Sequence, residues 1–385
     1  MAIISFGNIN KKILFAVFGG IFKLLSDLLV KFLRESNKIE IREHPFFLGI
    51  NAGLGYCISF IPFLIFKRNY DYLNQKNFDV DEKLIYNETD DYFLEKREKK
   101  FRPWLIIAFC DFFQKLLSFI YTSLYNFWMF DILFILIFSH FILKVKLYKH
   151  HFISLMLIII FGIAIIIIYN LYKEKSEDFL FKILNTFVIE IIFSLQIVVA
   201  KYAIENKLSS PYEICLFEGV FILAINLILL IIFTFIPMSE IKYIKKTEYE
   251  GKMYIDNFFQ YFSKISYIEV ISFIIIMLGR FGFNIFCLLT IKYFTPSHSI
   301  IILIIGEVYF AFYDLEPLWR VFIEYFIYAL LIFVMLVFLE IIEINLWGLQ
   351  KNTEKNISLR AGQIESIIDE VETEEEKEDE CSNKL

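Results

Sequence analysis

The feature that most constrains the fold is a series of apolar stretches, each about as long as one membrane-spanning helix. A helix needs roughly 20 apolar residues to cross the hydrocarbon core of a bilayer, and its internal backbone hydrogen bonds allow it to do so. The stretches lie near residues 13–32, 46–66, 104–121, 126–143, 152–171, 183–202, 212–236, 267–289, 297–313 and 321–344. The sequence therefore predicts an all-α integral membrane protein with about ten transmembrane helices.

The composition supports this class of protein. Apolar residues make up 58% of the chain, and Phe alone occurs 46 times. Soluble proteins are about 45–50% apolar, so the surplus exceeds what one buried core needs. It excludes a disordered chain, a small disulfide scaffold and a nucleic-acid-binding protein. A lipid bilayer is therefore an expected partner, and nucleic acid is not.

The charge distribution separates the C-terminal region from the rest. The net charge of −6 comes mostly from this region, because ten of the sixteen residues from 365 to 380 are acidic. A block of like charge cannot bury enough apolar surface to fold. We expect residues 349–385 to form a disordered acidic tail in the cytosol, where it offers a surface for a cytosolic partner.

Two long polar loops, residues 67–103 and 237–266, interrupt the otherwise short joints. Lys and Arg concentrate in short cytoplasmic loops, and their distribution here favours cytosolic placement of both termini. The glycosylation sequons at Asn87 and Asn356 would then face the cytosol and stay unmodified.

Ionisable side chains inside the apolar stretches are the main clue to function. Each costs at least about 2.5–3.5 kcal/mol when it faces lipid, so it usually faces the interior of the bundle. Lys23, Asp27 and Lys31 recur at every fourth position and share one helical face. This face is either a charged stripe along a pore or a ladder of paired charges, and both interpretations stay open. Asp111 and Lys115 have the same spacing and can also pair locally.

Further polar residues interrupt other stretches. Asp111 and Asp131 weaken the two stretches between 104 and 143, so that one re-entrant element there, with eight or nine spans in total, stays an alternative. Asp131 lies near the start of its stretch, where we expect it at the membrane interface. Arg280 and Glu307 have opposite charges on neighbouring stretches, which suggests an ion pair between helices.

Motifs of enzymes are absent from the sequence. There is no H-E-x-x-H, G-x-S-x-G, P-loop or G-x-G-x-x-G pattern, the five His residues are scattered, and no two Cys have metal or redox spacing. We therefore expect no catalytic residues, no metal and no cofactor. An enzyme is the weaker alternative to a transport function.

A set of short motifs occurs in order over residues 20–350. They are Lys31 with His44-Pro45-Phe46-Phe47, Gly53 with Cys57, Tyr121-Thr122-Ser123, the 141–151 segment with Gly162, Gln196 to Lys201, Pro211 with Phe217-Glu218-Gly219, Asp256-Asn257 with Gln260, Phe283-Asn284, and Ile291 to Thr295. Together they resemble the drug/metabolite transporter superfamily with its EamA-type repeats. The branch they resemble most is the eukaryotic nucleotide-sugar-transporter-like group, solute carrier family 35 subfamily F.

The resemblance implies two five-helix repeats of opposite orientation. The first would cover residues 1–172, with the polar loop 67–103, and the second residues 173–348, with the polar loop 237–266. Transporters of this kind bind their substrate near the midplane, where the repeats meet, and alternate access by rocking one repeat against the other. The implied substrate-binding candidates are Lys31, Gln196, Glu218, Asp111, Arg280 and Asn284. Lys201 also matches a motif, but its position near a span end suits an interface anchor.

The chain departs from the family pattern at several charged positions. Family charges are replaced at Leu54, Ala200, Ser299, Leu303 and the segment 129–132. These departures leave two alternatives, a different substrate or a loss of transport.

The function predicted from the sequence is secondary transport of a small polar metabolite, with a nucleotide-sugar-like solute as one option. Alternating access would need no ATP. The alternatives are a non-transporting polytopic membrane scaffold and, less favoured, a membrane-embedded enzyme. An endomembrane location is favoured over the plasma membrane, and a homodimer stays open.

Overall fold

The computed structural model describes most of the apolar part of the chain. It describes residues 4–6, 14–35, 45–65, 89–120, 128–145, 149–172, 179–206, 209–236, 247–249, 252–257, 259, 267–313, 318–339 and 342–344. The chain divides into two compact units. The smaller unit comprises Met1–Ile9, Lys146–Phe161 and Ile327–Leu385, and the larger comprises Asn10–Val145 and Gly162–Phe326. The acidic tail at 349–385 and the sequons Asn87 and Asn356 lie outside the described residues.

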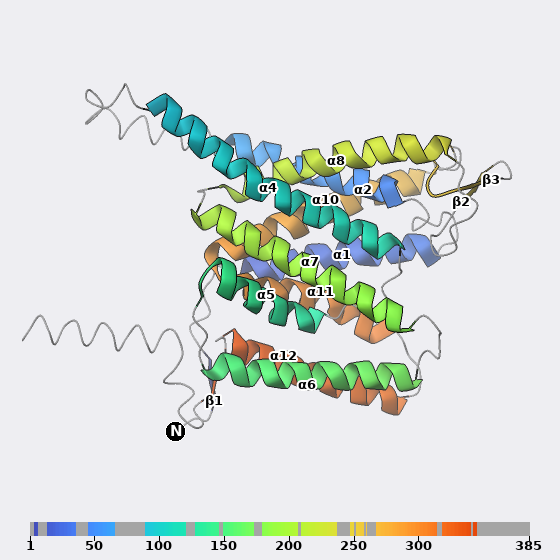
Figure 1. The fold of residues 1–385 in the computed structure, drawn as a ribbon. Coiled ribbons are helices and arrows are strands. Elements are labelled where there is room, and N and C mark those ends of the chain that lie inside the picture. Colours follow the sequence, from blue (N-terminus) through green and yellow to red (C-terminus); the bar gives the residue numbers. More distant parts are fainter. Residues whose placement is uncertain are drawn as a thin grey trace, which may run out of the picture. The chain divides into compact units, whose positions relative to one another are not determined.

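Every predicted apolar stretch contains a helix (Figure 1). The helices are α1 (Leu14–Glu35), α2 (Pro45–Cys57), α4 (Thr89–Ile120), α5 (Trp128–Ile142), α6 (Lys149–Tyr172), α7 (Phe179–Asn206), α8 (Pro211–Phe235), α10 (Tyr267–Tyr293), α11 (Ile300–Tyr313) and α12 (Leu318–Phe338). The short 3₁₀ helix η3 (Pro296–Ser299) precedes α11. The helical class predicted from the sequence is therefore confirmed.

Four helical segments are long and apolar enough to cross a membrane, among the residues that the structure describes. They are Phe46–Ile65, Ile183–Asn206, Pro211–Phe235 and Tyr267–Tyr293. The first of these continues α2 past a turn at residues 58–59. Shorter apolar helices occur at Phe130–Ile142, His151–Ala164, Pro296–Gly306 and Ala329–Phe338. These helices are compatible with a membrane protein.

Three segments differ from their predicted form. Helix α4 begins at Thr89, inside the predicted polar loop 67–103, because residues 89–102 are rich in Glu and Lys, which favour helices. The predicted loop 237–266 contains the hairpin of β2 (Thr247–Tyr249) and β3 (Lys252–Tyr254).

The end of the last predicted span is also different. Helix α12 stops at Phe338, and Ile342–Ile344 forms strand β4, which pairs antiparallel with β1 (Ile4–Phe6). Two β-branched residues flanking Glu343 explain the preference for an extended strand. In the same smaller unit, the rings of His151 on α6 and Phe338 on α12 lie 5.0 Å apart between centroids.

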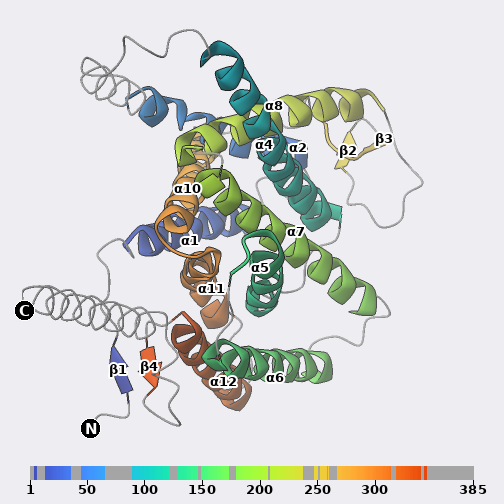
Figure 2. The same ribbon diagram turned by 60° about the vertical axis from the view of Figure 1, so that its left-hand side comes forward.

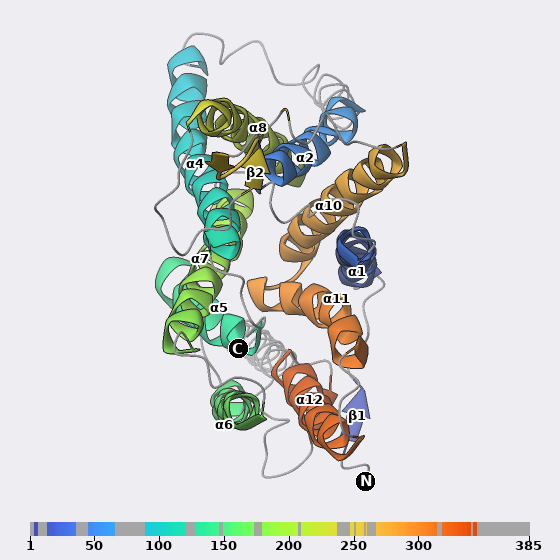
Figure 3. The same cartoon turned by 90° about the vertical axis from the view of Figure 1, so that its right-hand side faces the viewer.

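Helices of the larger unit pack closely at glycines. Helix α1 lies along α10 and α11, α2 lies along α8, and α7 lies along α4 and α5 (Figures 2 and 3). A Cβ on Gly53 of α2 would come within 2.7 Å of the Leu223 backbone nitrogen on α8, so only glycine allows this approach. A Cβ on Gly282 of α10 would lie 2.3 Å from the Phe22 ring of α1.

The polarity of α8 runs opposite to that of a soluble helix. Glu218 and Asn226 are buried, whereas Ile228 and Ile231 are 57% and 59% exposed. Helices in lipid keep polar groups inside and expose apolar ones, because the surrounding hydrocarbon is as apolar as the side chains. The burial pattern is therefore compatible with a lipid surrounding.

Asp256 joins two segments that are far apart in the sequence. Its Oδ2 accepts hydrogen bonds from the backbone N–H groups of Phe46 and Phe47, at 3.0 and 3.3 Å. The carboxylate thus caps the N-terminus of α2, where backbone donors lack partners within the helix. Two of the family-like motifs therefore meet at one structural contact.

Candidate functional site: a buried polar network

Helix α8 begins with local signals that fix its N-terminus. Ser210 is the N-cap, Pro211 occupies the first helical turn, and Glu213 completes a capping box by accepting from the Ser210 N–H at 2.9 Å. Glu218 follows two turns later and is 1% exposed. The well-defined N-terminus of α8 therefore fixes the position at which the Glu218 carboxyl group enters the interior of the bundle.

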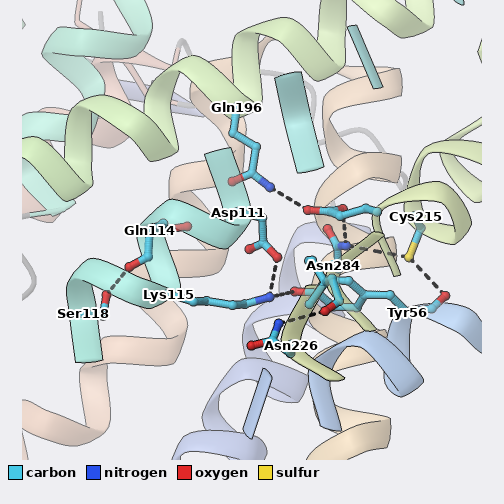
Figure 4. A network of polar contacts seen from close by, with 11 residues as sticks. Tyr56, Asp111, Gln114, Lys115, Ser118, Gln196, Cys215, Asn226 and Asn284 are labelled. Atoms are coloured by element: carbon cyan, nitrogen blue, oxygen red, sulfur yellow. Dashed lines mark hydrogen bonds and ion pairs between the residues drawn. The ribbon is translucent and has the colours of Figure 1, made fainter. Parts of the chain in front are cut away.

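Two neutral amides hold the Glu218 carboxyl group. Gln196 Nε2 of α7 donates to Glu218 Oε1 at 2.8 Å, and Asn284 Nδ2 of α10 donates to Oε2 at 2.8 Å (Figure 4). Among the described residues, no Lys or Arg forms an ion pair with Glu218. We call Gln196, Glu218 and Asn284 the carboxyl–amide cluster. It connects three helices through side chains alone.

Cys215 connects this cluster to α2. Asn284 Nδ2 lies 3.7 Å from Cys215 Sγ, and Cys215 Sγ lies 3.7 Å from the Tyr56 carbonyl oxygen. Cys215 is fully buried one turn before Glu218. The thiol group therefore makes weak hydrogen bonds that extend the network to a fourth helix.

A second group of polar side chains joins α2 to α4. Lys115 pairs with Asp111 on the same helix and donates to the Tyr56 hydroxyl group at 3.3 Å. Its Nζ also lies 4.6 Å from the centre of the Tyr56 ring, a cation–π contact. The predicted pairing of Asp111 with Lys115 is confirmed. We call Tyr56, Asp111 and Lys115 the lysine–tyrosine cluster (Figure 4).

The side-chain carbonyl oxygen of Gln196 lacks a hydrogen-bond donor among the described residues. Gln196 Oε1 is buried and has no hydrogen-bond partner among the described residues, while Nε2 of the same amide is engaged by Glu218. A buried acceptor without a donor costs about 1–3 kcal/mol. Such a group beside a buried carboxylate is what a site awaiting a hydrogen-bond donor would contain.

A third group lies one turn away along α10. Arg280 precedes Asn284 by four residues, so the two side chains share one face of the helix. An Arg280 guanidinium nitrogen lies 3.9 Å from Asp27 Oδ1, and Lys23 donates to Asp27 Oδ2 at 2.9 Å. Lys23, Asp27 and Arg280 form what we call the arginine cluster, which connects α1 with α10.

The structure brings together three of the predicted substrate-binding residues. Gln196 and Asn284 each donate to Glu218, and Asp111 lies in the adjoining lysine–tyrosine cluster. Arg280 lies in the arginine cluster. Lys31 belongs to α1, but its side chain lies outside the described residues.

Three local expectations have different outcomes. Lys23 pairs with Asp27, as the interpretation of a ladder of paired charges expects. Asp131 is buried, and its carboxyl group accepts from Ser194 on α7 at 3.3 Å, while its expected position at the membrane interface stays a prediction. The Arg280–Glu307 pair stays a prediction, since the Glu307 side chain lies outside the described residues.

Sequence reasoning missed Tyr56 and Cys215. Both lie in apolar stretches, where a Tyr or Cys side chain is not distinguished from its apolar neighbours. Neither residue carries a charge that would indicate a functional role. Tyr56 lies between the family-like residues Gly53 and Cys57, which is the one signal that could have pointed to it.

The described side chains do not suggest a metal centre. No group of three or more His, Cys, Asp or Glu residues among them is arranged to hold a metal ion. What the network can do chemically is exchange hydrogen bonds and charge with a polar guest. Comparison of the chain with protein-family models and with curated proteins finds no match.

Proposed function

We propose that the protein is a multi-pass integral membrane protein that moves a small polar metabolite by alternating access. The observation that carries this proposal is Glu218, a carboxyl group buried in an apolar bundle and held by amides from two other helices. An ionisable residue inside a membrane helix is costly, and such residues usually line the path of a solute or ion.

The way the helices pair supports an arrangement of two repeats. Matching the first five helices to the second five relates α1 to α7, α2 to α8, α4 to α10 and α5 to α11. Under this exchange the packing of α1 on α10 becomes that of α7 on α4, and the packing of α1 on α11 becomes that of α7 on α5. The exchange leaves two packings unchanged, that of α2 on α8 and that of α5 on α11, because the two helices of each pair are exchanged with each other. Repeats at 1–172 and 173–348 account for this pattern.

Membership of the drug/metabolite transporter superfamily is part of the proposal. The Asp256 carboxylate binds the backbone N–H groups of Phe46 and Phe47, so that two of the family-like motifs contact each other at the N-terminus of α2. The proposal places about ten spans in an endomembrane with both termini in the cytosol. Glycosylation of Asn87 or Asn356 on expression in eukaryotic cells would contradict this topology.

Uptake by purified protein in proteoliposomes tests the transport function. Glu218→Ala and Gln196→Ala should each abolish concentrative or exchange uptake of any metabolite that the parent protein takes up from a panel. Asn226→Ala is the matched control, because Asn226 is also buried on α8 but donates to the carbonyl oxygen of Ile222 in its own helix. This control should retain most of the uptake.

Other outcomes identify other functions. If the parent protein takes up no metabolite while it stays folded, the scaffold replaces the transporter. If a metabolite is recovered with altered covalent structure, the protein is an enzyme.

A further inference from the structure

We infer that the transported solute is a small zwitterion of the amino-acid type, with its ammonium group at Gln196 and Glu218 and its carboxylate at Arg280. This inference rests on the proposed transport function and names the class of its substrate. It follows from Gln196 Oε1, an unsatisfied acceptor in the cluster that α10 joins through Asn284, and from Arg280, a guanidinium group with accessible donors one turn away on α10.

The first end of the site requires a hydrogen-bond donor. Gln196 Oε1 is a buried acceptor without a partner among the described residues, and it belongs to the amide that binds Glu218. An ammonium group has several N–H donors and can satisfy this oxygen while its charge faces the carboxylate. An anionic group at this end would leave the oxygen unsatisfied.

The charges near this end favour a cation as well. Asp111 and Lys115 offset each other in their ion pair, whereas Glu218 is bound by neutral amides only. Asp111 and Lys115 are the charged groups whose fields reach Glu218 from α4. The described charges of the carboxyl–amide and lysine–tyrosine clusters therefore sum to −1 with Glu218 ionised. A nucleotide diphosphate would add further negative charge here, which disfavours it.

The second end offers donors to an anion. A guanidinium group has five N–H donors. In the described residues Arg280 makes a single ion contact, at 3.9 Å, to an Asp27 carboxylate that Lys23 already binds at 2.9 Å. The Arg280 side chain is 36% exposed, so its donors are accessible to a solute. A guanidinium group binds a carboxylate in a bidentate manner, which makes it suited to the acid end of an amino acid.

Helix α10 contributes one residue to each end of the proposed site. Arg280 and Asn284 are four residues apart on α10, a rise of about 6 Å. A simple amine would give Arg280 no partner beyond Asp27, and a simple acid would leave Gln196 Oε1 without one. A zwitterion satisfies both.

Ligand binding to the full chain in detergent tests the inference. The probes are the proteinogenic amino acids and γ-aminobutyrate, with butylamine and butyrate as singly charged analogues and uridine diphosphate glucose as the anion. At least one zwitterion should raise the unfolding temperature and bind about tenfold or more tightly than either analogue. Arg280→Gln should remove this preference and leave butylamine binding within about twofold of the parent. Arg280→Lys should retain part of the preference for zwitterions. If Arg280→Gln does not fold, Arg280→Lys is the variant in which the preference is measured.

The outcomes separate the inference from the proposed function. Tight binding and uptake of uridine diphosphate glucose, or of butyrate over every zwitterion, would overturn the inference and leave the transporter intact. A preference for zwitterions that is unchanged in Arg280→Gln would overturn the assignment of the acid end. If no metabolite of any class binds or enters proteoliposomes, the transport function fails together with the inference.

Discussion

Glu218 and Lys201 are two buried charges in the same helical unit, and their surroundings differ. Lys201 on α7 donates at 2.8 Å to the carbonyl oxygens of Ile291 and Phe294 at the C-terminus of α10 and pairs with Glu205 at 2.8 Å. Its three ammonium donors are thus all satisfied, two of them by backbone. Glu218 is held only by side-chain amides, and one of these has an unsatisfied oxygen.

The difference indicates which charge is structural. The last carbonyl groups of a helix have no partners within it and carry partial negative charge, so a lysine there stabilises the helix end. Lys201 is buried in the protein, and its expected place as an anchor at the membrane interface stays a prediction. The helix holds its terminal carbonyl oxygens in fixed positions, whereas side-chain amides can rotate. A charge held by amides can therefore exchange partners with a solute.

The largest expected effect on stability comes from removing Lys201. Lys201→Met removes the lysine donor from the carbonyl oxygens of Ile291 and Phe294 at the end of α10, and it should lower the free energy of unfolding by about 3 kcal/mol. Lys292→Met, the same change at an exposed lysine in the last turn of α10, should change it by less than about 0.5 kcal/mol. Denaturant unfolding in detergent measures both. Equal losses would mean that Lys201 is not a structural charge.

A smaller loss should follow from separating α2 and α8. A Cβ at Gly219 would lie 2.7 Å from Tyr56 Cβ and 2.8 Å from the Cys57 backbone nitrogen. Gly219→Ala should therefore cost about 2 kcal/mol and move Tyr56 away from Lys115. Thermal unfolding reports the loss, and Val220→Ala at the exposed neighbouring position is the control. A variant as stable as the parent protein would show that the two helices are not held this closely.

Asp256 extends the comparison to a negative charge bound by backbone. Asp256→Ala should remove the cap of α2 and lower the free energy of unfolding by about 1 kcal/mol, since capping residues contribute about this much. Asp256→Asn keeps an acceptor oxygen and should lose less. Hydrogen exchange at the first residues of α2 locates the effect. Unchanged exchange in Asp256→Ala contradicts a capping role.

The smallest effect on stability is expected at Glu218, the charge that we assign to function. In Glu218→Gln the Gln196 amide can rotate and present its unsatisfied oxygen to the new N–H₂ group. The free energy of unfolding should therefore stay within about 1 kcal/mol of the parent value. Solute binding or uptake should nevertheless be lost. A loss of stability as large as that of Lys201→Met would place Glu218 with the structural charges.

Local sequence patterns were enough to locate the helices. The apolar stretches gave each helix to within a few residues in most cases, and Ser210, Pro211 and Glu213 mark the start of α8. The errors were at segments where local preferences compete. The charged residues before Trp104 form helix rather than loop, and Ile342–Ile344 pairs with a strand from the other end of the chain.

The sequence also marked Gln196, Glu218 and Asn284 as costly polar groups that must face the interior. It could not show that Gln196 and Asn284 both bind Glu218, because they lie 22 and 66 residues from it on separate helices. The side of a helix that is buried can be predicted from the order of apolar and polar residues along that helix alone. A hydrogen bond between helices depends on how each is rotated and how closely glycines such as Gly53 let the backbones approach. The sequence by itself therefore determined that Gln196, Glu218 and Asn284 face the interior, and the tertiary structure decided that Lys201 is satisfied and that Gln196 is not.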